Sequence, residues 1–506
     1  EPLLTLNDPT IDFGNNIQNS RTIQVNPTLN MNLLYNKFGM FRRLNNNNDS
    51  TGNAFGKALL NALASVKNIS GSYIRNDGTF LPGYIPQTDA FGYDFDADAP
   101  GVGFLLGSQE DIRFKALANG WLTRDTLQNQ LYVNSLNEKL NLRGTIEPFR
   151  DFRLELTAFK NSSKNFTTNF RYNNSAQGFE SLNPITTGDY SISMIALGSA
   201  FKDKNDAKTS AVFQQFLANR TVISQRLGSE NPNSTGIGAD GFADGYGKTS
   251  QEVVIPAFLA AYRNKDAGGT SLSKMPKIPI PNWRLTYNGL VKVDAVSKLF
   301  SAFDLSHGYS STYNVNGYTS LIRYRESNGA VDVRDNQGDF LPFYQFSQVT
   351  LFEQFVPLLG IDMRMKNNMT ANVEYRKSRS MSLSLANSQM ASQKDQAFVI
   401  GFGYRTSDFR FPFGLFKSVN LKNDLNFKLD VAIRDNKTVI YRADVDDPEI
   451  SGGSKNITFR PSIDYVLNQR FNLRLFYDSN VTKPYTSQTF TTAFTNFGIN
   501  LRFTIQ

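Results

Sequence analysis

The chain has no cysteine, one histidine and two tryptophans among its 506 residues. The absence of cysteine excludes disulfides, thiol catalysis, iron–sulfur clusters and zinc sites built on cysteine. Because His307 is the one imidazole, a metal site with two histidine ligands is excluded as well. Several common kinds of catalytic and metal chemistry are therefore closed to this sequence.

Long apolar runs and a strong excess of one charge sign are also missing. The longest apolar run, Val253–Tyr262, has ten residues and contains Pro256, whereas a membrane-spanning helix needs about 20 apolar residues. The 53 Lys and Arg residues are scattered among 45 Asp and Glu residues, so we expect no nucleic-acid partner. The first residues, Glu1–Leu4, lack Met and a leader pattern, and we expect a mature or processed end, or a cut from a longer protein.

Alternation of apolar and polar residues is the strongest positive signal. Over about the last 230 residues, successive segments alternate for about ten positions and then break at a turn, which is typical of β-strands. Polar residues such as Asn426, Lys428, Asp430 and Arg434 lie between the apolar ones. The clearest apolar rows are Leu425, Phe427, Leu429, Val431 and Ile433; Ile457, Phe459, Ile463, Tyr465 and Leu467; Phe471, Leu473, Leu475 and Tyr477; and Phe497, Ile499, Leu501, Phe503 and Ile505.

The connections between these segments differ in length. Asn367-Asn368, Asp435-Asn436 and Asn468-Gln469 predict tight turns, whereas 406–417 and 479–491 are long links. Short turns at one rim and long loops at the other are typical of an outer-membrane β-barrel. A closed barrel satisfies every backbone hydrogen bond within lipid and exposes one side chain in two to it.

This interpretation assigns lipid-facing side chains and interfacial aromatics. The predicted lipid-facing residues are Leu425, Phe427, Leu429, Val431, Ile433, Phe497, Ile499, Leu501 and Phe503. The predicted aromatic girdles include Tyr375, Tyr404, Tyr441 and Tyr477. The fold class is therefore all-β membrane: part of a very large antiparallel transmembrane β-barrel, with about a dozen to fourteen strands in this chain.

The first 280 residues are mixed, with strands and helices. Ile23–Leu33 forms a strand-like row, and Leu140–Ile146 with Phe152–Ala158 predicts a hairpin. Three helices are predicted: one with Phe55, Leu59, Leu63 and Val66 on one face; one after a capping box of Ser108 and Asp111 that ends near Gly120; and one from Val212 to Leu227, stopped by Gly228 and Pro232.

These signals divide the chain into five parts. The predicted parts are a barrel strand region at 1–50, a helical or loop excursion at 51–135, a barrel hairpin at 136–175, a second excursion at 176–280, and C-terminal barrel strands at 281–506. We expect the two excursions to lie at a rim of the barrel or inside its lumen.

Two acidic clusters and a glycine motif could hold a ligand. Gly236–Gly241 matches G-x-G-x-x-G, but no strand precedes it, so a glycine loop is favoured over a dinucleotide site. Asp94, Asp96 and Asp98 could bind calcium, but an EF-hand would need Gly at Ala99 and Glu at Leu105. A solvated acidic turn is favoured there, and also at the second cluster, which comprises Asp444, Asp446, Asp447 and Glu449.

The single histidine is the remaining catalytic candidate. No nucleophile motif accompanies His307, so a lumen-facing or hydrogen-bonded role is favoured over catalysis. We therefore expect no catalytic, cofactor-binding or metal-binding residues, and no enzymatic activity.

Long strings of this sequence resemble the cell-surface SprA family, also called Sov. The resemblance covers most of the chain and is densest after Lys277. The matching strings are Lys277–Tyr287, Ser306–Tyr313, Pro357–Met363, Asn372–Arg379, Leu421–Phe427 and Tyr465–Tyr477.

The resemblance implies an outer-membrane translocon of the type 9 secretion system. Such a protein exports folded proteins and, in gliding bacteria, adhesins, as a passive conduit gated by partners. The chain would be the C-terminal portion of one barrel in the class that reaches about 36 strands. The implied partners are the N-terminal portion of the same barrel, a PorV-like shuttle β-barrel, plug and periplasmic accessory proteins, secreted cargo, and membrane lipid or lipopolysaccharide. The implied location is the outer membrane, crossed many times.

The last strand also resembles the signal that barrel-assembly machinery recognises. Asn496, Gly498, Leu501 and Phe503 match polar-x-Gly-x-x-apolar-x-apolar, although Thr504–Gln506 follow the aromatic residue. Two other readings remain open at this point. One is a stand-alone outer-membrane porin or plugged receptor for small solutes. The other is a soluble β-rich adhesin, which the apolar stripes argue against, since a soluble sheet would need a second layer to bury them.

Overall fold

The structure is a computed structural model that describes residues 13–37, 65–202, 210–407, 409–410, 420–421, 423–442, 448–468, 470–486 and 489–503. Phe55, Leu59 and Leu63, predicted to share a helix, lie outside these residues. Val66, assigned to the same helix, is instead the first residue of a strand. In the part of the chain that the structure describes, no helix is long and apolar enough to cross a membrane.

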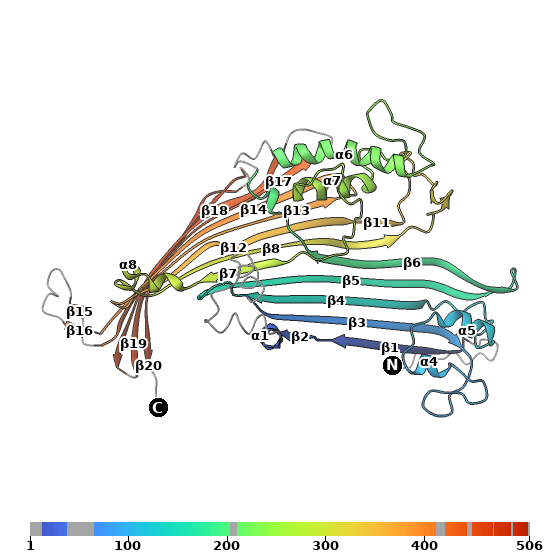
Figure 1. Cartoon of the computed structure of the whole chain (residues 1–506), viewed down its shortest axis with the longest axis horizontal. Coiled ribbons are helices and arrows are strands. Elements are labelled where there is room, and N and C mark those ends of the chain that lie inside the picture. Colours follow the sequence, from blue (N-terminus) through green and yellow to red (C-terminus); the bar gives the residue numbers. More distant parts are fainter. Residues whose placement is uncertain are drawn as a thin grey trace, which may run out of the picture.

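One antiparallel sheet of 16 strands organises the chain (Figure 1). Its main path runs β1-β3-β4-β5-β6-β8-β12-β13-β14-β17-β18-β19-β20; in addition, β2 pairs with β3, β7 pairs with β5 and β8, and β11 pairs with β8. The strands of this sheet are β1 (Asn15–Val25), β2 (Thr28–Asn30), β3 (Val66–Tyr84), β4 (Tyr132–Ile146), β5 (Phe152–Asn173), β6 (Gly178–Ser193), β7 (Asn282–Tyr287), β8 (Phe300–Ser320), β11 (Tyr344–Phe346), β12 (Gln348–Met365), β13 (Met369–Ser384), β14 (Gln389–Thr406), β17 (Leu425–Arg442), β18 (Glu449–Asn468), β19 (Phe471–Pro484) and β20 (Thr492–Phe503). The short strands β9 (Glu326–Ser327), β10 (Ala330–Val331), β15 (Phe409–Arg410) and β16 (Asn420–Leu421) form two small ribbons.

The sheet is open within the described residues. Its edge strands, β1 and β20, each pair with one neighbour, β3 and β19 respectively. The antiparallel β architecture predicted from the alternation is thus present, whereas the described strands do not close into a barrel.

The strands are about twice as long as a bilayer requires. β17 has 18 residues and β5 has 22, whereas about ten residues of tilted strand cross the hydrocarbon core. Asp435 and Asn436, predicted as a tight turn, lie in the middle of β17. The turn prediction is wrong because both residues are held in register by β14 on one side and β18 on the other, which outweighs their local preference for turns.

The other predicted turns are partly confirmed. Asn368 has a φ of 64° between β12 and β13, and β18 joins β19 through a tight connection after Asn468. Both turns lie at the same rim as the long connection between β14 and β17, so long and short connections do not segregate by rim as predicted. The predicted link at 479–491 is also shorter than expected, because β19 continues to Pro484.

The helices are short except for two. They are α1 (Met31–Tyr35), α4 (Val102–Leu105), α5 (Ile112–Ala118), η1 (Leu197–Ser199), α6 (Ala211–Glu230), α7 (Gln251–Arg263), η2 (Gly289–Lys292) and α8 (Asp294–Ser297). α5 ends before Gly120 as predicted, but its N-cap is Asp111, whose carboxylate accepts the backbone N–H of Arg113 at 3.2 Å. The predicted capping box with Ser108 is therefore wrong, because the chain turns into the helix three residues later.

The two longest helices follow each other in the chain. α6 confirms the predicted third helix and ends at Glu230, two residues past Gly228. α7 contains the apolar run Val253–Tyr262, every residue of which is buried. A helix that is apolar on all sides is a core helix, and the run serves as one here.

The sheet also takes strands from both predicted excursions. β3 lies inside 51–135 and β6 lies inside 176–280, so each range contributes a full strand to the wall. The apolar and polar residues of β3 do not alternate regularly across its Gly71–Gly78 stretch, which hid the strand from pattern reading.

β6 and β7 occupy one position in the sheet and act as a composite strand. Both lie between β5 and β8: β6 pairs with Lys160–Asn173 of β5, and β7 pairs with Phe152–Thr157. The Ile280 N–H donates to the Ser193 carbonyl at 2.9 Å and closes the gap between them. Helices α6 and α7 are thus inserted into the middle of a strand rather than into a loop at the rim.

Candidate functional site

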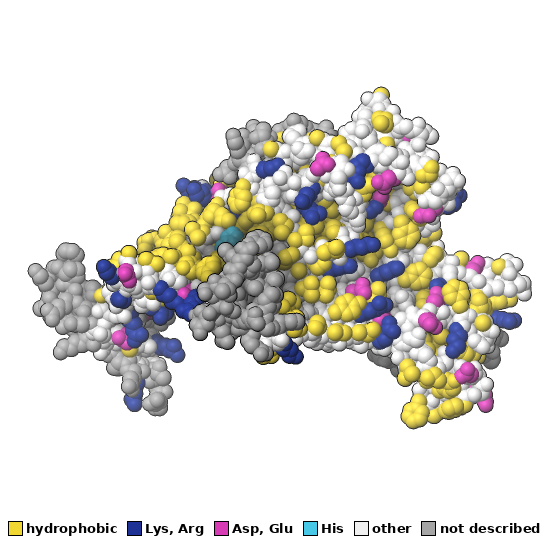
Figure 2. Space-filling model, viewed as in Figure 1, with side chains coloured by type: hydrophobic (Ala, Val, Ile, Leu, Met, Phe, Trp, Pro, Cys, Tyr) yellow, Lys and Arg dark blue, Asp and Glu magenta, His cyan; other side chains and the backbone are white. Residues whose placement is uncertain are grey.

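One face of the sheet carries an apolar band that runs across β12 to β20. On β17 it consists of Phe427, Leu429, Val431 and Ile433, and strict pairing with β14 and β18 extends each position sideways. Leu429, for example, lies between Phe402 and Pro461. Figure 2 shows hydrophobic side chains gathered on this face beside the helices. The other positions of this apolar band include Ile361, Met363, Val373, Tyr375, Phe398, Ile400, Tyr404, Ile457, Phe459, Ile463, Leu475, Phe497, Ile499, Leu501 and Phe503.

The predicted lipid-facing residues lie together on this face, with one difference. Phe497 and Phe503 of β20 are 69% and 63% exposed, and Ile433 of β17 is 38% exposed. Leu425 at the start of β17 is 4% exposed, although the alternation assigned it to lipid. It lies at the rim end of the strand, where it is buried within the chain, so the exposed part of the β17 row begins at Phe427.

A charged girdle follows the apolar band on the same face. In β13 the alternation Met369–Tyr375 gives way to Lys377 and Arg379, and the neighbouring strands carry charges in the same two rows. These charged girdle residues are Glu353 of β12, Lys377 and Arg379 of β13, Lys394 of β14, Asp435 and Lys437 of β17, Lys455 of β18 and Lys483 of β19. The charges mark where the apolar environment of the band must end.

Helices α6 and α7 cover the same face beyond the charged girdle. The ring of Phe213 in α6 packs 4.8 Å from that of Tyr441 in β17, and the Tyr262 hydroxyl of α7 lies 3.1 Å from the sulfur of Met390 in β14. Tyr441 and Met390 share the face of the apolar band because their strands alternate without a bulge over this length. The α6–α7 part of the second excursion therefore lies on the band's face.

This placement contradicts one predicted interfacial aromatic, Tyr441, whereas two others, Tyr375 and Tyr404, lie at the two ends of the apolar band. Tyr441 was expected at the membrane interface but is 3% exposed beneath α6. Tyr404 lies at the rim side of the apolar band and stacks on Phe427, with ring centroids 6.3 Å apart. Tyr375 lies at the end of the apolar band next to the charged girdle, where its hydroxyl donates to Gln396 at 3.1 Å.

A buried ion pair fastens the segment before α6 to the sheet. The Arg379 guanidinium donates to the Glu353 carboxylate at 2.6 Å, and both side chains are almost fully buried, 6% and 1% exposed. Arg379 also donates to the carbonyl and the hydroxyl of Ser199 in η1, and Tyr309 donates to Glu353 at 2.7 Å. Every charged atom of the pair thus has a partner, as burial of charge requires. Pattern reading missed these residues because charges interrupt the apolar row.

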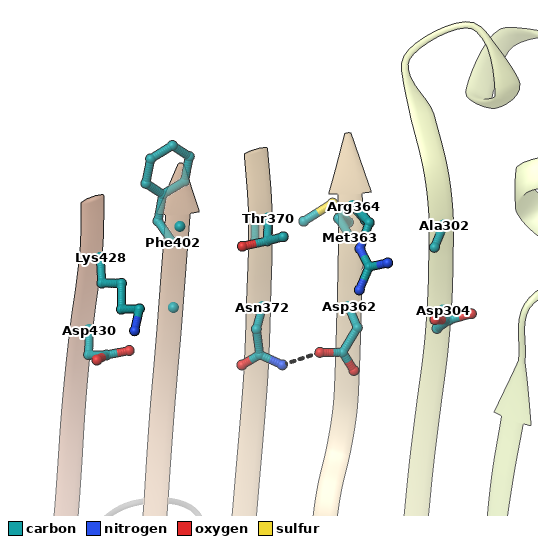
Figure 3. Close-up of a pocket in the computed structure, with 13 residues that line it drawn as sticks. Ala302, Asp304, Asp362, Met363, Arg364, Thr370, Asn372, Phe402, Lys428 and Asp430 are labelled. Carbon is teal, nitrogen blue, oxygen red and sulfur yellow. Dashed lines mark hydrogen bonds between the residues drawn. The ribbon is translucent and has the colours of Figure 1, made fainter. Parts of the chain in front are cut away.

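The opposite face of the same strands is polar and charged. Asp304, Asp362, Asn372 and Asp430 share one row across β8, β12, β13 and β17, as Figure 3 shows. The Asn372 amide donates to Asp362 at 2.5 Å. The next row contains Arg364, Thr370 and Lys428, and together the two rows line an open recess of about 620 Å³. A second recess of about 760 Å³ adjoins it and shares Asp304 and Asp362.

Both charge signs alternate over this polar face. Arg434 pairs with Asp395 at 2.6 Å, Arg460 pairs with Asp478 at 2.8 Å, and Arg474 reaches Asp464 at 3.6 Å. Exposed ion pairs of this kind keep a surface hydrated and add little to stability. Chemically, this face is a polar surface with charges of both signs. Gly401 and Gly403 have no side chains, so the recess is deeper at these two positions.

The remaining candidates have local structural roles. His307 lies on the face of the apolar band, not on the polar face, and its Nδ1 hydrogen-bonds to the Leu358 carbonyl at 2.7 Å. Gly236–Gly241 follows α6 and forms a turn closed by the Ile237–Ala243 bridge. The Asp94 carboxylate accepts the backbone N–H groups of Asp96 and Ala97, and the structure shows no convergence of the three carboxylates. Of the second acidic cluster, Asp444, Asp446 and Asp447 lie outside the described residues, and Glu449 begins β18.

The predicted assembly residues lie on the edge strand β20. Asn496 and Gly498 share the polar face, and Leu501 and Phe503 share the face of the apolar band. A Cβ at Gly498 would lie 2.6 Å from the Phe476 ring, so the ring would have to shift to admit a side chain there. Residues Thr504–Gln506 lie outside the described residues.

The chain matches no protein-family model, and it matches no curated protein.

Proposed function

We propose that the chain is part of the wall of an outer-membrane protein-conducting channel that exports folded proteins, as the resemblance to the SprA family implies. The observation that carries the proposal is the division of one long sheet into an apolar band on one face and a hydrated, mixed-charge face behind it. The apolar band spans seven residues of β17, Phe427–Ile433, where about ten residues of tilted strand cross a hydrocarbon core, and the polar face then lines the conduit.

The open edges of the sheet support a larger assembly. A strand edge in lipid leaves backbone groups unsatisfied at a cost of several kcal/mol each, so a membrane sheet must close. On this proposal, strands from the N-terminal portion of the same barrel pair with β1 and β20. The cargo path is passive, and the shuttle barrel, plug and periplasmic accessory proteins supply gating and energy coupling.

The mixed charge of the polar face suits a conduit for varied cargo. A face of one sign would attract or repel proteins according to their net charge. Alternating pairs such as Arg434–Asp395 and Arg460–Asp478 cancel at a distance and leave a hydrated surface with no strong preference. Specificity is then a property of cargo delivery rather than of this wall.

A solute porin or receptor plugged by the helices is the alternative reading, and the position of the helices weakens it. A plug has to fill the lumen, which the polar face would line. Helices α6 and α7 pack on the face of the apolar band instead, against Tyr441 and Met390.

Single-cysteine labelling tests the conduit, because the natural chain has no cysteine background. Asn372→Cys places a thiol on the polar face, and Val373→Cys places one on the apolar band one residue away. In native outer membranes, a membrane-impermeant maleimide is expected to label Asn372→Cys and not Val373→Cys. A folded cargo stalled in transit is expected to protect Asn372→Cys. Equal labelling of both thiols, or labelling unaffected by stalled cargo, would contradict the proposal.

A further inference from the structure

A small cavity lies at the end of the sheet that α6 and α7 cover, where β11 pairs with the last residues of β8. Its volume is about 170 Å³, and it reaches the surface beside Phe343, which is 48% exposed. The wall comes from the turn before α7, the loop before β11 and β11 itself. Six of the lining side chains are aromatic: Tyr246, Tyr324, Phe340, Phe343, Tyr344 and Phe346.

The aromatic rings of the wall pack against one another. The ring centroid of Phe343 lies 5.2 Å from that of Tyr324 and 4.6 Å from that of Tyr344, and both pairs are edge-to-face. The rings of Tyr246 and Phe340 lie 5.3 Å apart. A further ring in the cavity would therefore meet both faces and edges, which are the contacts that aromatic pairs favour. Apolar cavities of about 150 Å³ accept a benzene-sized molecule, so this cavity fits one aromatic ring.

One ion pair interrupts the apolar wall. The Lys274 ammonium donates to Oε2 of Glu252 in the first turn of α7, and the two side chains are 25% and 17% exposed. The nearby Tyr324 hydroxyl donates to Glu326 at 2.6 Å. Within the described residues, Oε1 of Glu252 has no hydrogen-bond donor. The cavity thus offers balanced charge and one carboxylate oxygen that can still accept a hydrogen bond.

This lining disfavours charged ligands and sugars. A cation would have to displace Lys274 from Glu252, and an anion would have to displace Glu252 from Lys274. A sugar would bury several hydroxyl groups against ring faces, and each buried hydroxyl without a partner costs free energy. A phenol brings one hydroxyl, which Glu252 can accept.

We propose that this cavity binds a neutral aromatic ring that carries one hydrogen-bond donor, as in a phenol or a tyrosine side chain. The ring packs among the six aromatic side chains, and its hydroxyl donates to Oε1 of Glu252. The inference stands on the cavity alone and goes beyond the proposed channel activity. A free phenol and a tyrosine within a polypeptide share this chemistry, and the test separates them.

Disulfide tethering measures the preference of the cavity, because the natural chain has no cysteine. Pro342→Cys places a thiol on the cavity wall, and Leu341→Cys repeats the measurement from the neighbouring position. Ile322→Cys is the control, since it precedes β11 in the same loop, is 54% exposed and does not line the cavity. The intact assembly is equilibrated with a 4-hydroxyphenethyl or a phenethyl disulfide and a competing thiol. Intact-mass measurement then gives the tethered fraction of this chain.

At Pro342→Cys, the hydroxyphenyl probe is expected to resist the competing thiol at least about tenfold better than the phenyl probe, because a hydrogen bond to a charged acceptor is strong. At Ile322→Cys, both probes should be retained equally and weakly. Equal retention of the two probes at Pro342→Cys and Leu341→Cys, or no advantage over Ile322→Cys, would overturn the proposal.

Replacing the ion pair separates the ring from its donor. Glu252→Leu combined with Lys274→Met removes the acceptor and leaves no charge without its partner. Both probes should then be retained equally at Pro342→Cys, and still better than at Ile322→Cys. A preference for the hydroxyphenyl probe that survived this change would contradict the assigned role of Glu252.

Competition identifies the source of the ring. Free p-cresol and a capped Gly-Tyr-Gly peptide are each added before the hydroxyphenyl probe, with a capped Gly-Ser-Gly peptide as the control. Protection of Pro342→Cys by p-cresol alone indicates a small phenol. Protection by the tyrosine peptide as well, and not by the serine peptide, indicates a tyrosine within a polypeptide. Protection by neither p-cresol nor the tyrosine peptide would rule out the proposed ligand class.

Discussion

At the scale of single residues, successive side chains in a strand point to opposite faces of the sheet, so neighbouring positions lie in different environments. Leu429 and Lys428 are neighbours in β17, yet one belongs to the apolar band and the other lines the polar recess. Because the two faces of such a strand differ chemically, the same new side chain should have opposite effects at adjacent positions, and comparing the two substitutions tests which face each position lies on.

On the proposed membrane position, Leu429→Arg is expected to destabilise the protein by roughly 2–4 kcal/mol, because it would place a charge on the lipid face near mid-membrane. Ala432→Arg in the same strand is the matched control, since Ala432 lies on the polar face opposite Val399 and Thr458. Urea titration in lipid bilayers measures both. If both arginine variants were equally stable, the assignment of Leu429 to the lipid face and Ala432 to the polar face would be wrong.

Arg379→Met is expected to cost about 3–5 kcal/mol, because it leaves the buried Glu353 carboxylate without its cation. The double variant Arg379→Met, Glu353→Leu should recover part of that loss, since no charge remains buried. Heat-induced unfolding followed by gel mobility measures both. A double variant less stable than the single one would mean that Glu353 stabilises the fold even without its cation, for example through the hydrogen bond from Tyr309.

Asp244 links the glycine turn after α6 to the loop that precedes β11. Hydrogen bonds from Arg334, and then from the Thr235 hydroxyl and backbone N–H, hold the pKa of the Asp244 carboxyl well below its usual range. A carboxyl with a lowered folded-state pKa adds stability above its unfolded pKa of about 3.9, and that stability is lost as the pH falls. Asp244→Asn should therefore cost roughly 1 kcal/mol at pH 7, and the difference from the natural protein should shrink below about pH 4. Melting curves from pH 3 to pH 7 test this, and a difference that stays constant with pH would contradict it.

At the scale of elements, the edge strand β20 depends on a glycine. Gly498→Ala is expected to weaken its pairing with β19 by about 1–3 kcal/mol, because the new Cβ would press on the Phe476 ring. Phe476→Ala in the same chain should relieve the clash, so the two substitutions should be less than additive. The rate of appearance of heat-resistant protein in the outer membrane measures assembly. Strict additivity would show that Gly498 is required for another reason, such as recognition by assembly machinery.

The elements that alternation predicts are those exposed on both faces. β17, β18 and β20 follow the sequence pattern closely, because each face meets a uniform environment over many residues. α7 escaped prediction because its ten apolar residues have no polar side that would reveal a helical period. β3 escaped because glycines and charged residues occupy its centre.

The side of the sheet on which an element packs was harder to predict than the presence of the element. Nothing in Val212–Leu227 says whether α6 packs inside or outside the wall, because that depends on where the chain leaves the sheet. The exit lies between Ser193 and Asn282, within a composite strand, and this follows from pairing of both segments with β5 and β8. Such long-range pairing leaves no local signal in a single sequence.

At the scale of the whole molecule, β1 and β20 are the edges of the described sheet, and the proposed membrane position would require further strands to pair with them. In β20, alternate backbone groups pair with β19 and the intervening ones point away from the sheet. If further strands close the wall, all amides of β20 should resist hydrogen exchange in the membrane-embedded assembly, as is expected of the central strand β14, which is paired on both sides. Exchange measured by mass spectrometry tests this. Rapid exchange at every second amide of β20 would mean that the edge stays open.

The interruption between β6 and β7 has a consequence for how deep the protein sits. Because α6 and α7 leave the sheet between β6 and β7 and pack on the face of the apolar band, they form a shoulder just beyond the charged girdle. On the proposed membrane position, a polar shoulder cannot enter the hydrocarbon layer, so it would limit how deep the protein sits. A thicker or thinner bilayer would then be accommodated at the opposite rim of the sheet.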